Sequence, residues 1–178
     1  SRLVRQKLNC KQVKNKIMDF ETLGDWCKWL EKNFSNEVMI PTLPVIIRLD
    51  GNNFHNWTKG LERPFDKKLT ELMTETTKFL VQETNAVVGY TQSDEISLIL
   101  NDLDGENTSL WFDGQVQKMV SVAASIATAH FNKYFKNPSG KMAYFDARVF
   151  ALKEDEVTQY LNWRQKDSNF SRNWEDYG

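Results

Sequence analysis

The order of its strand-like and helix-like segments constrains the fold of this chain more than any other feature. From residue 45 onward, short β-rich runs alternate with long stretches in which apolar residues recur at helical spacing. The expected strands are Val45–Leu49, Ala86–Tyr90, Ile96–Leu100 and Ala143–Ala151, and the expected long helices are Lys67–Thr84 and Gln115–Tyr134. This order predicts a ferredoxin-like βαββαβ domain of the α/β (α+β) class, in which an antiparallel sheet carries helices on one face.

The connection between the first two strands determines which strands are neighbours. A right-handed crossover makes these two strands parallel and leaves room between them for the third. The third strand therefore lies antiparallel to the first, and the end of the first strand shares a sheet edge with the hairpin turn at residues 92–95. Asp50 reaches that edge from one side, and Asp94 with Glu95 reaches it from the other.

Carboxylates from two neighbouring strands indicate a magnesium site at this edge. Mg²⁺ prefers hard oxygen ligands and completes its octahedron with phosphate oxygens and water. Polymerase palms and nucleotidyl cyclases use this device with two metal ions roughly 3.5 to 4 Å apart, which activate an attacking hydroxyl and stabilise the leaving oxygens. Either acidic motif alone is more often only a turn, so the prediction of two Mg²⁺ ions at Asp50 and Asp94 depends on the strand order.

The segment after Asp50 has the composition of a phosphate-binding loop. Its glycine and small polar residues allow successive backbone N–H groups to face a triphosphate. The loop residues are Gly51, Asn52, Asn53, Phe54 and His55, and the basic residues expected near the same phosphates are Lys59, Arg63 and Lys118. Each basic residue alone is more often a solvated surface residue. Ser93 either bonds a phosphate or closes the turn, and His55 either orients the nucleotide or is structural.

Composition narrows the remaining classes of protein. A hydrophobic content of 40% over 178 residues suits one domain with a real core. The formal net charge is only -1, so a nucleic-acid contact has to use a local patch. Two cysteines and two histidines argue against structural zinc and a disulfide framework. No apolar run approaches the roughly 20 residues that span a bilayer, and no signal sequence is visible, so we expect an intracellular protein without a membrane partner.

Two segments are expected along the chain. Residues 1–17 contain basic residues and no acidic one, and they are interpreted as a basic arm on RNA phosphates or as a solvated or artificial leader. Residues 18–178 are expected to form a palm-like catalytic domain. In that domain a helix is expected over Phe20–Phe34, and a short one from about Glu154 to Arg164.

Further motifs occur along most of the chain. They are the run from Arg48 to His55, Arg63-Pro64-Phe65-Asp66, the run from Gly89 to Ser97, the helix that begins Lys118-Met-Val-Ser, Phe145-Asp146-Ala-Arg148-Val149 and Trp163-Arg164-Gln165-Lys-Asp167. In type and order, from about Phe20 to Asp167, they resemble the tRNA-His guanylyltransferase family, the 3′-to-5′ nucleotide polymerases.

The resemblance implies a polymerase-palm fold in which the Asp50 carboxylate, the Gly51 carbonyl and the Asp94 carboxylate bind Mg²⁺. It implies that a tRNA 5′-phosphate attacks ATP or GTP, and that the 3′-hydroxyl of an incoming nucleotide then displaces the activating group. The implied partners are tRNA and nucleoside triphosphates, and the family is commonly tetrameric. The expected compartment is the cytoplasm, with organelles left open. Ser93 and Glu95 flank the second metal ligand, Asn53, Phe54 and His55 meet the triphosphate, and Arg63 and Lys118 handle nucleotide or tRNA.

The sequence departs from the eukaryotic guanylyltransferases after Gln165. Their motif His-Ile-Asn-Asn-Leu-Tyr-Asn should follow, but the chain instead reads Asp167-Ser-Asn-Phe-Ser-Arg172. This favours the guanylyltransferase-like proteins, which extend or repair truncated tRNA 5′ ends using template pairing. Because the chain stops at Gly178, the resemblance also implies that an RNA-gripping C-terminal part of the family is absent from it.

Two other functions stay open on the sequence alone. A nucleotidyl cyclase or cyclic-dinucleotide synthase uses the same palm, metals and triphosphate with a different acceptor. A non-catalytic ferredoxin-like RNA-binding module presents aromatic residues on exposed strands and has no need of an acidic edge. The central strands here carry aliphatic residues and the edge carries carboxylates, which favours the catalytic interpretation.

Overall fold

The structure, a computed structural model, describes residues 25, 27–29, 37–39, 43–58, 65–101 and 109–175. The chain divides into two units, Ser1–Asn36 and Glu37–Gly178. In the first unit, residues 25 and 27–29 are helical, inside the helix expected over Phe20–Phe34. The basic segment 1–17 lies outside the described residues, so its interpretation stays a prediction. All that follows concerns the second unit.

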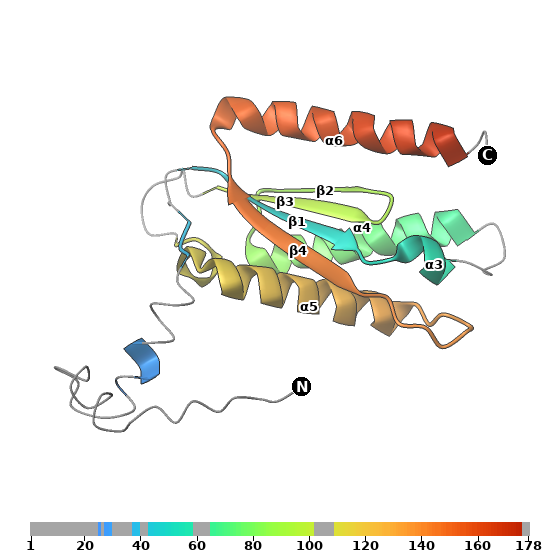
Figure 1. Cartoon of the computed structure of the whole chain (residues 1–178), viewed down its shortest axis with the longest axis horizontal. Helices are drawn as coiled ribbons and strands as arrows, with labels where there is room; N and C mark the ends of the chain where they lie inside the picture. Colours follow the sequence, from blue (N-terminus) through green and yellow to red (C-terminus); the bar gives the residue numbers. More distant parts are fainter. Residues whose placement is uncertain are drawn as a thin grey trace, which may run out of the picture. The chain divides into compact units, whose positions relative to one another are not determined.

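A four-stranded antiparallel sheet forms the centre of this unit (Figure 1). Its strands are β1 (Val45–Gly51), β2 (Val88–Gln92), β3 (Glu95–Leu100) and β4 (Phe145–Ala151). They lie in the order β2-β3-β1-β4, and each pair of neighbours is antiparallel. The predicted ferredoxin-like order is therefore confirmed, with the third strand between the first two.

Two long helices cover one face of the sheet, as predicted (Figure 1). They are α4 (Phe65–Thr84) and α5 (Val116–Tyr134). Alternate residues of a strand point to opposite faces, so Val45, Ile47 and Leu49 of β1 all face these helices, and all three are fully buried. Each such side chain stabilises the fold by about 1.5–3 kcal/mol relative to its exposed state.

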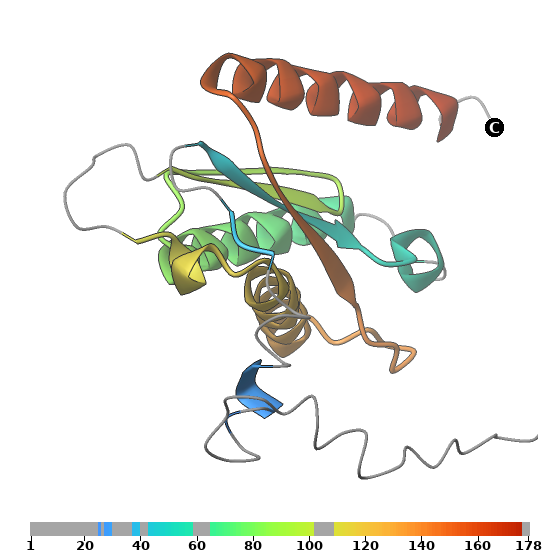
Figure 2. The ribbon, with the colours of Figure 1, turned by 60° about the vertical axis from the view of Figure 1, so that its left-hand side comes forward.

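A third long helix, α6 (Glu154–Glu175), lies over the opposite face of the sheet (Figures 1 and 2). It is longer than the short helix expected from Glu154 to Arg164. The expectation that helices lie on one face therefore holds for α4 and α5 but not for α6. Ile46, whose side chain points away from α4 and α5, is fully buried, and the Phe150 ring meets the Tyr160 ring of α6 at 5.4 Å. Because α6 contains few apolar residues, its sequence pattern did not predict this packing.

A short helix, α3 (Phe54–Thr58), follows β1 directly and was expected only as a polar loop. Five residues are too few for a periodic pattern, and packing supplies their stability instead. Phe54 and Trp57 stack on each other at 5.2 Å and both meet the Phe131 ring of α5. A turn, η1 (Trp111–Gly114), precedes α5. None of the described helices has the length and apolar character needed to cross a membrane.

Candidate active site

The end of β1 and the β2–β3 turn meet at one edge of the sheet and bring the two aspartates together. Asp50 is paired in register with Glu95, the first residue of β3. The next residue, Gly51, donates its backbone N–H to the carbonyl oxygen of Asp94 at 3.0 Å. The predicted meeting of Asp50 and Asp94 at a shared edge is thus present, and backbone hydrogen bonds between neighbouring strands hold it.

Negative charge accumulates around Asp50. Burial raises the pKa of its carboxyl above the ordinary value, and the nearby Asp94 raises the same pKa further. Glu95 and Asp146 add smaller contributions in the same direction, whereas Arg48 lowers it. Burial and these neighbouring carboxylates therefore disfavour the charged form of Asp50 in the metal-free protein, and a cation bound at this edge would offset that cost.

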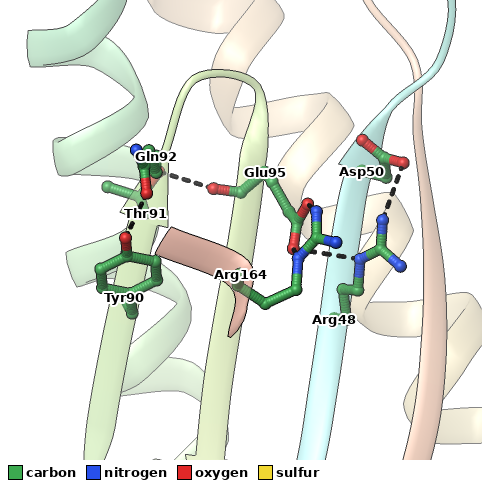
Figure 3. Close-up of polar contacts among 7 residues, drawn as sticks. All are labelled: Arg48, Asp50, Tyr90, Thr91, Gln92, Glu95 and Arg164. Carbon is green, nitrogen blue, oxygen red and sulfur yellow. Dashed lines mark hydrogen bonds and ion pairs between the residues drawn. The ribbon is translucent and has the colours of Figure 1, made fainter. Parts of the chain in front are cut away.

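The turn that carries Asp94 has an unusual backbone. Only Ser93 and Asp94 separate β2 from β3. Ser93 has a φ of 57°, in the left-handed region that favours glycine and asparagine. The Thr91 hydroxyl donates to the Glu95 carbonyl at 2.9 Å and closes the hairpin beneath this turn (Figure 3). Strain of this kind persists only where surrounding contacts impose it, and it is frequent at functional sites.

A chain of ion pairs connects α6 to Asp50 (Figure 3). The Glu95 carboxylate accepts a hydrogen bond from Arg164 Nε at 2.7 Å, and a second bond from the same guanidinium reaches its other oxygen. Arg48 lies 3.1 Å from Glu95 through Nε and 3.3 Å from Asp50 through its terminal nitrogen. The side chains of Glu95 and Arg164 are only 14% and 12% exposed, so solvent screens this pair weakly.

Sequence reasoning found no role for Arg164. It lies 69 residues beyond Glu95, and only the return of α6 over the sheet brings the two together. The motif Trp163-Arg164-Gln165 marked the residue but gave no partner for it. Glu95, expected to flank the metal ligand Asp94, has its carboxylate engaged by two arginines, Arg48 and Arg164.

Residues in the loop after Asp50 make more contacts within the protein than their composition indicated. The backbone N–H of Gly51 bonds to Asp94, and that of Asn52 donates to the Tyr144 carbonyl at 2.8 Å, so neither faces a triphosphate. Phe54 is buried among aromatic rings. A Cβ on Gly51 would lie 2.4 Å from the Phe54 ring, which explains the glycine. Asn52 and Asn53 are exposed just before α3, where the Asn53 side-chain oxygen accepts a hydrogen bond from the Asn56 amide at 2.6 Å.

Within the described part of the chain, the structure does not place the expected basic residues together near the phosphates. Lys59, Arg63 and the side chain of His55 lie outside the described part of the chain. Lys118 is exposed near the start of α5, where its ammonium lies 5.8 Å from the Phe112 ring. Asn132, near the other end of α5, bonds the Ala143 backbone just before β4. At a rise of 1.5 Å per residue, Lys118 is separated from Asn132 by about 21 Å along the helix axis.

The donor set at the edge fits a hard divalent cation that is shared with a substrate. Among the described residues there is no group of three or more His, Cys, Asp or Glu side chains placed to hold a metal alone. Mg²⁺, however, is usually bound through one or two carboxylates together with substrate phosphates and water. Asp50, Asp94 and the Gly51 carbonyl are the groups that would hold such a cation, and a cation there would offset the charge of Asp50, whose pKa is raised by burial and by Asp94.

Comparisons with known proteins agree with this geometry. The family model described as tRNAHis guanylyltransferase matches residues 26–153. The chain is 30% identical over 169 residues to the uncharacterized protein R259 of Acanthamoeba polyphaga mimivirus, covering 81% of this chain and 58% of the relative. It is also 30% identical over 141 residues to the tRNA(His) guanylyltransferase of Schizosaccharomyces pombe, covering 75% of this chain and 52% of the relative.

Solved structures give the same result. A bacterial tRNA(His) guanylyltransferase (Thg1)-like protein in complex with GTP is 43% identical, with a TM-score of 0.74, and the match covers 82% of this chain and 65% of that one. The complex of such a protein with ATP gives a TM-score of 0.76 at the same identity, with 83% and 65% covered. The chain thus spans roughly half to two thirds of the length of these relatives.

Proposed function

Since the chain belongs to the tRNA(His) guanylyltransferase family, we propose that it is a Mg²⁺-dependent nucleotidyltransferase that adds nucleotides to the 5′ end of tRNA in the 3′-to-5′ direction. The observation that carries the proposal is the meeting of Asp50 and Asp94 at one sheet edge, tied by the Gly51–Asp94 hydrogen bond. The GTP and ATP complexes of bacterial relatives support triphosphates as substrates.

The proposed reaction has two displacements at phosphorus. An oxygen of the tRNA 5′-phosphate attacks the α-phosphorus of ATP or GTP, and pyrophosphate leaves. The 3′-hydroxyl of an incoming nucleotide then attacks the 5′-phosphorus of the tRNA; its proton passes to solvent or a nearby base, and the nucleoside monophosphate leaves. Mg²⁺ at Asp50, Gly51 and Asp94, as two ions, would supply charge stabilisation for both displacements.

The remaining roles, contact with the triphosphate and positioning of the carboxylates, are assigned to residues by their place around the site. Asn52 and Asn53, exposed after β1, are placed to contact the triphosphate, and Ser93 sits beside Asp94 at the tip of the turn. Glu95 and Arg48 act as positioning residues, because Arg48 is shared between the Glu95 and Asp50 carboxylates. His55, Lys59, Arg63 and Lys118 stay candidates for nucleotide or tRNA contacts.

The proposed setting follows from the substrate. A tRNA substrate places the protein inside a cell, in the cytoplasm or an organelle. Repair of truncated 5′ ends is proposed over strict tRNA-His guanylylation, because the segment after Gln165 lacks the eukaryotic motif and the bacterial guanylyltransferase-like structures are 43% identical. Assembly as a homotetramer is part of the same proposal.

Transfer of labelled GTP to a tRNA that lacks its 5′ nucleotide tests the function directly. We expect label at the 5′ end with Mg²⁺, and none after chelation or in an Asp94→Asn variant. The matched control is Asp155→Asn, which removes an exposed carboxylate of α6. A labelled cyclic nucleotide instead of labelled RNA would contradict the proposal and indicate a cyclase.

A further inference from the structure

The longest acid-free stretch around the site runs from α5 into β4. Between Gln115 and Phe145 the chain contains no aspartate or glutamate, in a protein whose net charge is -1. Its lysines are Lys118 at one end of α5 and Lys133, Lys136 and Lys141 at the other. The last three are exposed, and among the described residues no carboxylate forms an ion pair with any of them.

These three lysines lie on the side of the molecule that carries the candidate nucleotide loop. The Trp57 indole N–H donates a hydrogen bond to the Lys141 carbonyl at 3.2 Å. The Lys141 ammonium donates to the Asn56 carbonyl at 3.3 Å. Asn137, which is buried, donates to the Trp57 carbonyl at 2.9 Å. These hydrogen bonds attach the segment 136–144 to α3, which begins at Phe54, four residues after Asp50.

Large apolar side chains stand exposed among the same lysines. Tyr134, Met142 and Tyr144 are 61%, 55% and 58% exposed. The Lys133 ammonium lies over the Tyr134 ring at 5.0 Å. An open groove of about 590 Å³ runs between α5 and Met142 and has no acidic lining residue. Asp146 and Glu75, which interacts with His130, border this region. Lysines interleaved with exposed aromatic rings suit a single nucleic-acid strand, whose phosphates pair with lysine and whose bases stack on the rings.

We propose that this basic patch, defined as Lys133, Lys136 and Lys141 with Tyr134, Met142 and Tyr144, binds the sugar–phosphate strand at the 5′ end of the RNA substrate. The inference rests on the proposed function and names the surface that guides the RNA toward the Asn52–Asn53 loop. It assigns the RNA phosphates nearest the 5′ end to lysines at the end of α5 opposite Lys118.

A second copy of the chain is the competing occupant, and charge argues against it. A two-fold contact would place the patch against itself and bring like charges together. Lysine is also depleted from the cores of protein interfaces. Neither objection applies to RNA, because its phosphates carry the opposite charge to the lysines.

The test compares two variants that lose the same charge. Lys133→Gln/Lys136→Gln removes patch lysines while keeping Lys141 on α3, and Lys153→Gln/Lys166→Gln removes two exposed lysines elsewhere. Affinity for a 5′-monophosphorylated tRNA lacking its first nucleotide is measured by fluorescence anisotropy at several salt concentrations. The patch variant should bind about tenfold more weakly, and the slope of log affinity against log salt should fall by about 1.4. The control variant should match the wild type.

GTP binding and sedimentation complete the test. The patch variant should bind GTP as the wild type does, since neither lysine is placed at the nucleotide. Equal RNA affinity in both variants would overturn the patch while leaving the proposed function intact. An altered oligomeric state with unchanged RNA affinity would assign the patch to a second copy and also overturn it. Failure of the wild type to bind RNA would overturn the patch and the proposed function together.

Discussion

At the scale of single residues, Asp50 is held between opposed electrostatic influences. Neighbouring carboxylates and burial disfavour its charge, and Arg48 favours it. The same arrangement that makes the carboxylate costly in the free protein makes the edge attractive to a cation. Charge at Asp50 is therefore expected to reduce stability in the metal-free protein and to serve binding when a metal is present.

The pH dependence of stability should show this cost. The pKa of Asp50 is raised in the folded state, so its contribution to the free energy of unfolding is fully present below the ordinary pKa of 3.8 and is lost as pH rises through the folded pKa. In chelator, Asp50→Asn should gain stability relative to the wild type between about pH 4 and 7. Calorimetry across this range, with Asp155→Asn as the control, checks the sign. A constant difference at all pH values would contradict it.

Gly51 is expected to tolerate no side chain. A Cβ would lie 2.4 Å from the Phe54 ring, which is itself packed against Trp57, Phe131 and Phe145. Gly51→Ala should lower the free energy of unfolding by about 1–3 kcal/mol through overpacking. Urea denaturation measures the loss. Adding Phe54→Leu should restore part of it, whereas an unaltered midpoint in Gly51→Ala would show that the ring moves freely.

At the scale of elements, α6 is attached to the sheet by polar contacts more than by an apolar stripe. Arg164 engages both oxygens of Glu95, and the Phe150–Tyr160 ring contact lies one turn before it. Burial raises the pKa of the Tyr160 hydroxyl above its ordinary value. Contacts from Arg164 to Glu95, from Glu95 to Arg48 and from Arg48 to Asp50 connect α6 to the Asp50 carboxylate.

Breaking this attachment should have a measurable cost. Arg164→Met leaves a largely buried carboxylate with Arg48 as its remaining partner, and we expect a loss of about 1–3 kcal/mol in the free energy of unfolding. Arg164→Lys should recover only part, because it lacks the two-pronged guanidinium. A double-mutant cycle with Glu95→Gln isolates the pair by urea denaturation. A coupling energy near zero would show that solvent already screens the contact.

At the scale of the whole molecule, ligand binding should appear as stability. A ligand that binds only the folded state raises the free energy of unfolding by about 2.7 kcal/mol at one hundred times its Kd. GTP with Mg²⁺ should therefore raise the melting temperature, and chelation should remove most of the rise. Asp94→Asn should lose the metal-dependent part. The same shift with and without Mg²⁺ would contradict a metal shared with the triphosphate.

The sequence by itself determined the order of strands and helices, and with it the strand neighbours. Periodicity is a local property, and the right-handed crossover rule converts it into topology. That was enough to place Asp50 beside Asp94, because both lie at strand ends whose positions the topology fixes.

Only the tertiary structure decided how distant side chains pair. The packing of α6 on the second face and the Arg164–Glu95 pair both depend on contacts between residues distant in sequence. The engagement of the Gly51 and Asn52 N–H groups likewise became visible only when their carbonyl partners were placed. Composition marked these residues as polar or basic, but hydrogen bonding and ion pairing depend on positions in space that no local pattern encodes.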